Sequence, residues 1–374
     1  MSRVPITGIG VIAPGAIGIA AFRELLASGR SAISEIDRFD TAGLSAHKAA
    51  LVRDFKPRDF IPPMKMRRMN ALSRLGVAAA KLAIDDCGAK PDVDTGVAIG
   101  TSFGPVQTSV EYMQEYVEKG ASLAPPQLFA ESVANAPGSH IAIEWGLRGF
   151  NMTITQRESS ALAAAMYAAA QLVKGSARAA LIGGVEEANE MLFSVLDRVG
   201  ALSKDVARPF DPHRDGVTLG EGGAVLVAGA GTRKPYGWLS GFGIARDTTA
   251  SISDWGTDAS SVVAAMRAAI DDAELSIADI DAIYASANGS VRGDAIEQRA
   301  IQLLFGDAVP PVVATKGIFG EYAAGGALQL VSALVALDEQ KLPAARDASL
   351  QHILVNSVSA GGGIVCAVVS KEGA

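Results

Sequence analysis

The chain has 374 residues, of which 49% are hydrophobic and 20% are charged, and its formal net charge is −7. This composition is typical of a globular protein with an ample core, and it argues against a nucleic-acid partner. The two cysteines, Cys87 and Cys366, are too few for a disulfide framework, and we expect both to be buried. The first residues lack a signal-peptide pattern, and no apolar run is long enough to span a membrane, so we expect a cytoplasmic protein.

Strands and helices alternate along the first half of the chain. Apolar patterning predicts strands at 4–9 and 97–100, and helices at 17–28, from Asn70 as the N-cap to about Cys87, and at 107–118. Further along, β-branched residues predict a strand at 153–155, which runs into an alanine-rich helix at 161–173. A strand at 179–182 follows, and the two glycines after it predict a sharp turn over 183–187.

The second half repeats this pattern in coarse form. We expect strands at 237–242, 282–286, 312–315, 353–357 and 364–369, and helices at 259–273, 294–304 and 323–340. Strands that alternate with helices predict parallel sheets covered on both faces. Between the halves, the glycine-rich segment 208–223 is expected to form a tight loop that contains ion pairs among Arg208, Asp211, Arg214 and Asp215.

A basic segment at 53–74 has two interpretations. It contains Arg53, Lys56, Arg58, Lys65, Arg67, Arg68 and Arg74, interleaved with phenylalanine and proline. One interpretation is a solvated surface. The other is a docking patch for a phosphorylated, acidic partner.

Glu158 lies at the join between the strand at 153–155 and the alanine-rich helix, and it also has two interpretations. Thr155 and Glu158 fit a capping box, in which each side chain satisfies the other's backbone N–H. Alternatively, Glu158 occupies a functional position, because the free N–H groups at a helix start favour an anion or an activated nucleophile.

Several motifs, in the same order, resemble the β-ketoacyl synthase family. ESSAL at 158–162 resembles CSSSL, in which the Cys takes the growing acyl chain, and RPFDPHRDGVTLGEGG at 208–223 is close to the family's RPFD-RDGFV-GEGA stretch. The resemblance covers nearly the whole chain. It implies a thiolase-like α/β fold with two duplicated halves, at residues 1–225 and 226–374, in a five-layer α-β-α-β-α arrangement.

The resemblance also implies a degenerate active site. Glu158 stands at the position of the nucleophilic Cys; SANGSVRGD places Asn288 at the first His, and TKGIFGEYAAGG retains Lys316 and places Glu321 at the second His. Ala360 of VSAGG stands where the family's gating Phe lies. The chain's own histidines fall at none of these positions: His47, His140, His213 and His352. We therefore expect no catalytic residue, no metal site and no cofactor.

A synthase framework without its catalytic residues resembles the chain-length factor, the non-condensing subunit that pairs with an active ketosynthase in type II polyketide assembly. The resemblance implies three partners: a catalytic ketosynthase, an acyl carrier protein and the polyketide acyl chain. It places the floor of the acyl tunnel at Ser109, Tyr112, Met113 and Tyr116, with Leu128 and Phe129 at its border. It also makes Lys56, Arg58, Lys65, Arg67 and Arg68 the candidate carrier-protein patch. Core packing explains the tunnel residues equally well.

A different class of function stays open. The chain could be an independent homodimeric enzyme that uses Glu158, either for acyl transfer or for malonyl-thioester decarboxylation. The decarboxylases related to the synthases keep both His residues, so Asn288 and Glu321 argue against that second activity.

Overall fold

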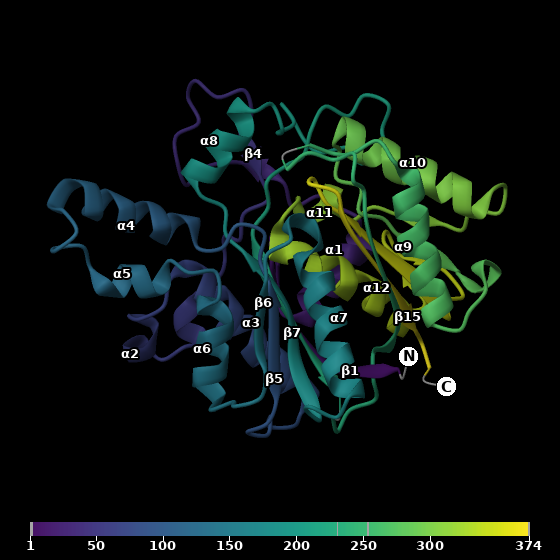
Figure 1. Cartoon of the computed structure of the whole chain (residues 1–374), viewed down its shortest axis with the longest axis horizontal. Coiled ribbons are helices and arrows are strands. Elements are labelled where there is room, and N and C mark those ends of the chain that lie inside the picture. Colours follow the sequence, from purple (N-terminus) through teal and green to yellow (C-terminus); the bar gives the residue numbers. More distant parts are fainter. Residues whose placement is uncertain (1–2, 230, 253, 373–374) are drawn as a thin grey trace.

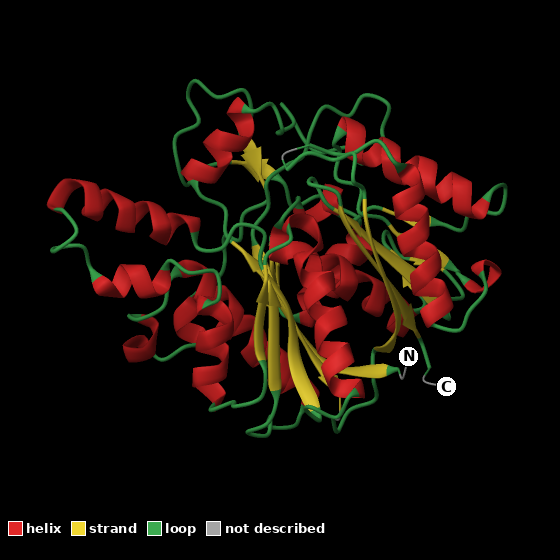
Figure 2. Ribbon diagram, viewed as in Figure 1, coloured by secondary structure: helices red, strands yellow, loops and turns green. Residues whose placement is uncertain are grey.

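The computed structural model of the chain describes residues 3–229, 231–252 and 254–372, which form one 11-stranded sheet with helices on its faces (Figures 1 and 2). The main strands of the first half are β1 (Val4–Ala13), β5 (Gly96–Gly100), β6 (Asn151–Ile154), β7 (Ala179–Glu186) and β8 (Gly222–Gly229). Those of the second half are β9 (Gly237–Arg246), β10 (Ala282–Tyr284), β11 (Val312–Val313), β14 (His352–Val358) and β15 (Gly363–Ser370).

Both halves have the same strand topology. The spatial order is β1-β8-β7-β5-β6 in the first half and β9-β15-β14-β10-β11 in the second. In each half the last strand lies antiparallel between the first and fourth strands, whereas the remaining pairs are parallel. This repeat confirms the duplication. The prediction of parallel sheets holds for the pairs among the other strands, whereas the last strand of each half runs antiparallel to both of its neighbours, so each sheet is mixed.

The helices complete the five predicted layers. On the outer face of the first half lie α3 (Ala71–Cys87) and α6 (Ala136–Trp145), and on that of the second half lie α9 (Ala259–Asp272) and α10 (Val291–Phe305). The helices α7 (Ser160–Val173) and α12 (Ala327–Glu339) lie between the two halves of the sheet. The thiolase-like α-β-α-β-α arrangement is therefore confirmed.

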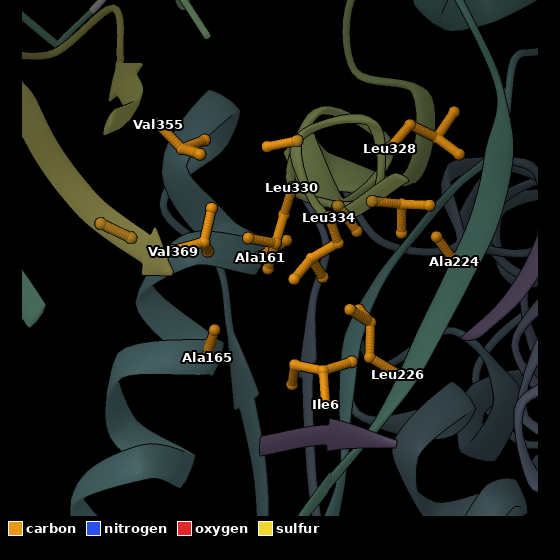
Figure 3. Close-up of a cluster of buried hydrophobic side chains, with 14 of the residues drawn as sticks. Ile6, Ala161, Ala165, Ala224, Leu226, Leu328, Leu330, Leu334, Val355 and Val369 are labelled. Atoms are coloured by element: carbon orange, nitrogen blue, oxygen red, sulfur yellow. The ribbon is translucent and has the colours of Figure 1, made fainter. Parts of the chain in front are cut away.

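The central layer forms the largest apolar core. Figure 3 shows Ala161 and Ala165 of α7 and Leu330 and Leu334 of α12 converging between strands of both halves. Because α7 is built largely of alanine, it packs close to α12 and to the sheet. Burial from both sides fixes the start of α7 relative to both halves, and Glu158 lies just before that start.

Smaller elements connect these layers. The other helices are α1 (Ile19–Ser28), α2 (Pro63–Met66), α4 (Val106–Lys119), α5 (Pro126–Glu131), α8 (Glu190–Arg198) and α11 (Lys316–Phe319). The short strands are β2 (Ala16–Ile17), β3 (Ser34–Glu35), β4 (Lys48–Ala49), β12 (Lys341–Leu342) and β13 (Arg346–Asp347), and 3-10 turns span Pro57–Asp59, Arg157–Ser159, Ile277–Asp279 and Ala323–Gly326. We call α4 and α5 the arm, because together they project from the body of the molecule (Figure 1).

Several local predictions are confirmed. Asn70 caps α3, because its Oδ1 accepts a hydrogen bond of 2.6 Å from the Ser73 N–H. Cys87 and Cys366 are both free and buried. None of the helices in the described ranges is long and apolar enough to cross a bilayer.

The predicted turn over 183–187 is wrong, because these residues continue β7 as far as Glu186. Gly184 does not form a turn; instead it lets another segment of the chain approach β7 closely. A Cβ at Gly184 would lie 2.0 Å from the carbonyl oxygen of Ala324, in the 3-10 turn that precedes α12. The helix expected from residue 323 accordingly starts only at Ala327.

The ion pairs expected within the 208–223 loop are also wrong. Arg214 lies 3.8 Å from Asp294 on α10, and Asp215 accepts a hydrogen bond of 2.6 Å from the Ser203 hydroxyl. The loop is therefore held by residues outside it. The expected division between residues 225 and 226 falls within β8, so we propose that the two halves meet between β8 and β9.

Candidate functional site

The join between β6 and α7 is a sharp turn. Arg157 has a φ of 48°, in the left-handed region that long side chains rarely adopt, and Glu158 follows it in the 3-10 turn. The predicted capping box between Thr155 and Glu158 is wrong, because neither oxygen of the Glu158 carboxyl is bonded to the Thr155 N–H among the described residues. The Gln156 N–H, at the start of the 3-10 turn, donates to the Ser160 hydroxyl at 2.8 Å. The Glu158 side chain is therefore not used to cap its own helix.

The second half of the chain fixes the position of this turn. The Ser357 hydroxyl donates to the Glu158 carbonyl at 2.8 Å, and the Ser359 hydroxyl accepts from the Ser159 N–H at 3.0 Å. Both serines lie at the end of β14 or just after it. Glu158 is thus held between the two halves, with its backbone bonded to the second.

The Glu158 carboxyl is buried with one polar contact. Its exposed fraction is 1%, its Oε1 accepts a 3.3 Å hydrogen bond from the Tyr322 hydroxyl, and its Oε2 has no partner among the described residues. Burial, together with the nearby negative charge of Glu321, raises the pKa of Glu158 to about 7. Near neutral pH this carboxyl is therefore divided between its protonated and ionised forms.

Glu321, in contrast, is fully hydrogen-bonded. Its Oε2 accepts from Lys316 Nζ at 2.7 Å and from Asn288 Nδ2 at 2.6 Å, and its Oε1 accepts from the Tyr322 N–H at 2.7 Å. All four residues are buried. The structure therefore brings together the positions that the sequence indicated, Glu158, Asn288, Lys316 and Glu321, through contacts with one further residue.

That further residue, Tyr322, was missed by the sequence analysis. It is 5% exposed, has a left-handed φ of 67°, and packs its ring edge-on against Phe103, with ring centroids 4.9 Å apart. Tyr322 directly follows Glu321, the residue at the position of the second His, and that neighbourhood in the sequence was the available signal.

The chemistry that this cluster can perform is limited. It holds two carboxyl groups, one ammonium group, one amide and one phenol, and these groups can move protons or hold charge. It contains neither a thiol nor an imidazole, and the two cysteines lie in other parts of the core. In the part of the chain that the structure describes, no group of three or more His, Cys, Asp or Glu residues could hold a metal ion.

The candidate tunnel residues lie on the arm. Met113, Tyr116 and Phe129 are 52%, 42% and 57% exposed, whereas Ser109, Tyr112 and Leu128 are half-buried. The core-packing alternative is therefore wrong for the three exposed residues. Beside α4, a groove of about 680 Å³ is lined mainly by apolar side chains: Phe103, Val106, Val110, Met113, Val117 and Met191, with Ser109 at its side.

The arm also has internal contacts. The Ser109 hydroxyl donates to the carbonyls of Pro105 at 3.0 Å and Ser132 at 3.3 Å. The Tyr112 ring lies 5.5 Å from the Phe129 ring, measured between centroids. Tyr112 therefore helps to hold α4 against α5, in addition to any contact with a ligand.

The five candidate docking residues are all exposed, as a docking patch requires. Lys65 pairs with Glu144 of α6 at 2.9 Å. The other four, Lys56, Arg58, Arg67 and Arg68, form no ion pair with any residue in the described ranges. Their charges are therefore available to a partner.

Comparison with known proteins decides the family. The profile of the "Beta-ketoacyl synthase, N-terminal domain" matches residues 1–231, and that of the "Beta-ketoacyl synthase, C-terminal domain" matches residues 236–349. The chain belongs to the β-ketoacyl synthase family. The chain therefore shares the sequence pattern and fold of this family but differs from it at Glu158, Asn288 and Glu321.

Relatives include both fatty-acid and polyketide proteins. The chain is 29% identical to the "3-oxoacyl-[acyl-carrier-protein] synthase 2" of Vibrio cholerae, with 91% of this chain and 87% of that protein covered. It is 30% identical to the "Actinorhodin polyketide putative beta-ketoacyl synthase 2" of Streptomyces coelicolor, with 90% and 86% covered. Among solved structures, "The ishigamide ketosynthase/chain length factor" matches with a TM-score of 0.90 and 26% identity over 100% of both chains.

Proposed function

We propose that this protein is a non-catalytic chain-length factor, which pairs with an active ketosynthase and limits the length of the polyketide made on an acyl carrier protein. One observation carries the proposal. The side chains at the three catalytic positions of the family are buried in one cluster, in which Asn288 bonds Glu321 and Tyr322 bonds both Glu158 and Glu321, and they include neither a thiol nor an imidazole.

This arrangement is unsuited to decarboxylative condensation. The reaction needs a thiolate to hold the acyl chain, and donors that stabilise the thioester oxyanion and the carbanion equivalent. Here Glu321 is an acceptor, and the amide N–H of Asn288 and the ammonium of Lys316 are already bonded to it. Both donor groups therefore lie against the Glu321 carboxylate, which would also repel a developing negative charge beside it.

Two surfaces support pairing with another subunit. The strand β6 ends the sheet, so one edge of its backbone lacks a strand partner in the described parts of the chain. The arm carries exposed apolar side chains, with Val117 76% and Leu123 68% exposed in addition to Met113, Tyr116 and Phe129. Apolar exposure on this scale is typical of a surface that a partner covers. We propose that the catalytic ketosynthase covers both surfaces.

The same arm supports the proposed control of chain length. In the assembly, Ser109, Tyr112, Met113 and Tyr116 would form the end wall of the partner's acyl tunnel, and Leu128 and Phe129 would border it. Exposed side chains can contribute to a cavity completed by a second subunit, whereas core residues cannot. The exposed residues Lys56, Arg58, Lys65, Arg67 and Arg68 would attract the acidic carrier protein.

The test is co-expression with a ketosynthase that has the Cys-His-His set. Light scattering should show a 1:1 complex with the ketosynthase, and only the complex should extend acyl chains on the carrier protein. The control is the same ketosynthase expressed alone. If the purified chain is a stable homodimer that turns over malonyl or acyl thioesters without a ketosynthase, the proposal fails.

A second function, an independent enzyme that uses Glu158, is favoured by one observation. Burial raises the pKa of Glu158 to about 7, and its Oε2 has no partner in the described part of the chain, as in a general base or acid. The variant Glu158→Gln separates the two functions. Loss of product from a complex that still assembles would support the enzyme, whereas unchanged product would support the chain-length factor.

A further inference from the structure

A second cavity, of about 460 Å³, lies away from the Glu158 cluster. It is enclosed by the start of α3, the segment 38–57 and the residues between β7 and α8. Its apolar lining comes from Phe39, Val52, Phe55 and Leu75, and its polar lining includes Arg38, Arg74, Gln107, Glu187, Asn189, Glu190 and Glu221. Glu190, the first residue of α8, is exposed, so water screens its charge. None of the residues of the proposed function lines it. We call it the α3 cavity.

The ion pair between Arg38 and Glu221 in the α3 cavity stabilises the fold. The two terminal nitrogens of Arg38 donate to the two carboxylate oxygens of Glu221 at 2.8 and 2.7 Å. Glu221 also accepts from the backbone N–H groups of Val52 at 2.8 Å and Ala188 at 3.2 Å. These contacts neutralise both charges and tie together three segments, so neither group is left to recognise a ligand.

Arg74 and Glu187 differ, because both keep unused hydrogen-bonding capacity. Arg74 Nη2 donates to the Met66 carbonyl at 3.3 Å, whereas its buried Nε has no partner and the residue has no ion pair within the described ranges. Glu187 is 4% exposed; its Oε1 accepts from the Gln107 N–H at 2.7 Å and from Asn189 Nδ2 at 3.4 Å, and its Oε2 has no partner among the described residues. Buried polar atoms without partners are rare in native proteins and are costly to maintain.

We infer that the α3 cavity binds a small organic anion, a carboxylate on a flat apolar body, with the carboxylate against Arg74 and the body along Phe39 and Phe55. A volume of about 460 Å³ is within the usual range for a small-molecule site. Because Glu221 neutralises Arg38, Arg74 supplies the uncompensated positive charge. Its guanidinium pairs well with a carboxylate.

Glu187 fits this ligand in its protonated form. Burial raises the pKa of Glu187 to about 7, so a substantial fraction is neutral near physiological pH. A neutral carboxyl can donate a hydrogen bond from its unused oxygen to an anion, whereas an ionised one would repel the anion. The site thus offers a fixed cation and a second donor on an apolar surface.

Benzoate is a suitable probe, with benzyl alcohol and benzylamine as size-matched compounds without the negative charge. Binding to the full chain, and to its complex with a ketosynthase, can be followed by ligand-observed NMR and calorimetry. We expect benzoate to bind measurably and at least several-fold more tightly than either of the other two. Absence of benzoate binding to the folded protein, or equal binding of benzylamine, would overturn the inference.

Two variants test the location of the site. Arg74→Gln should weaken benzoate binding by about tenfold or more, because a charge-assisted hydrogen bond is lost. Arg299→Gln, which removes an equivalent charge at an exposed position of α10, is the matched control and should leave the binding unchanged. Ala71→Phe adds a ring at an exposed residue on the cavity rim and should block the site without removing a core contact.

Circular dichroism and thermal unfolding establish that each variant is folded. If benzoate binds the folded Arg74→Gln and Ala71→Phe variants as tightly as the natural protein, the site is not the α3 cavity and the inference is wrong. These measurements require no turnover. Their outcome is therefore independent of the proposed role in polyketide synthesis.

Discussion

The hydroxyl of Tyr322 donates a hydrogen bond of 3.3 Å to Oε1 of Glu158, which lies 164 positions earlier in the chain. The backbone N–H of the same tyrosine donates to Glu321 at 2.7 Å. One residue thus connects the position of the family's nucleophile with that of its second His. Its ring occupies space beside the Glu158 carboxyl and contributes to the burial that raises the carboxyl's pKa.

The pH dependence of stability should change in Glu158→Gln. Because burial raises the pKa of Glu158 from 4.5 to about 7 in the folded state, its contribution to the free energy of unfolding is fully present below pH 4.5 and is lost as the pH rises to about 7. Glutamine does not ionise, so at pH 8 the variant should be more stable than the natural protein, by on the order of 1–3 kcal/mol. Urea unfolding at pH 5 and pH 8 measures this difference.

The comparison between the two proteins is essential to that experiment. Burial also raises the pKa of Glu186 to about 8 and the pKa of Glu297 to about 7. The free energy of unfolding of the natural protein therefore changes with pH through several groups at once. Subtracting the free energies of the two proteins at each pH isolates Glu158. A difference that stays constant from pH 5 to pH 8 would contradict the raised pKa.

Lys316→Met should strongly destabilise the protein. The Lys316 and Glu321 side chains are 3% and 1% exposed and lie 2.7 Å apart, so removing the ammonium leaves a buried carboxylate without its countercharge. The loss should be about 3–5 kcal/mol. The double variant Lys316→Met with Glu321→Gln removes both charges and should regain much of the lost free energy of unfolding. Chemical unfolding measures the free energy of unfolding of the single and the double variant. Equal values for these two variants would contradict the ion-pair argument.

Side-chain volume on the arm should set the length of the product. Met113→Ala and Tyr112→Ala should lengthen it, and Ser109→Phe should shorten it, because overpacking at a tunnel wall costs about 1–3 kcal/mol and shifts the partition between extension and release several-fold. Mass spectrometry of products from the complex measures the effect. Tyr112 also packs on Phe129, so its variant must be checked for assembly.

A matched control exists for Met113→Ala. Leu303 is 60% exposed on α10, far from the arm (Figure 1), and Leu303→Ala should leave product length unchanged. If the arm variants lower only the yield of folded complex and leave the product length the same, the length determinant lies elsewhere.

Removing charges from the basic segment should weaken use of the carrier protein. Arg67→Ala and Arg68→Ala should each lower kcat/KM for the acyl carrier protein by roughly two- to fivefold, as expected for exposed ion pairs. The effect should diminish at high salt, because screening weakens the natural contacts as well. Lys65→Ala is the internal control: Glu144 already pairs with Lys65, so its removal should matter less. Equal effects at low and high salt would contradict an electrostatic docking role.

The order of the main elements and the family could be predicted from the sequence, because apolar periodicity and the segments around 158, 208–223, 288 and 316–326 are local properties of the chain. The same is true of the loss of the catalytic side chains, which follows from the residue types at Glu158, Asn288 and Glu321. The N-cap at Asn70 likewise depends only on its neighbours in sequence.

The remaining features depend on segments that meet only after folding. The antiparallel last strand of each half depends on the partners it finds in the sheet. Gly184 pairs with strands on both sides, and its missing side chain leaves room for the Ala324 carbonyl from far along the chain. The capping box failed for a similar reason: the Glu158 carboxyl accepts a hydrogen bond from Tyr322, 164 positions later, instead of one from the Thr155 N–H. The pKa of Glu158 follows from that burial, because desolvation is a property of the surroundings that the fold assembles around a residue.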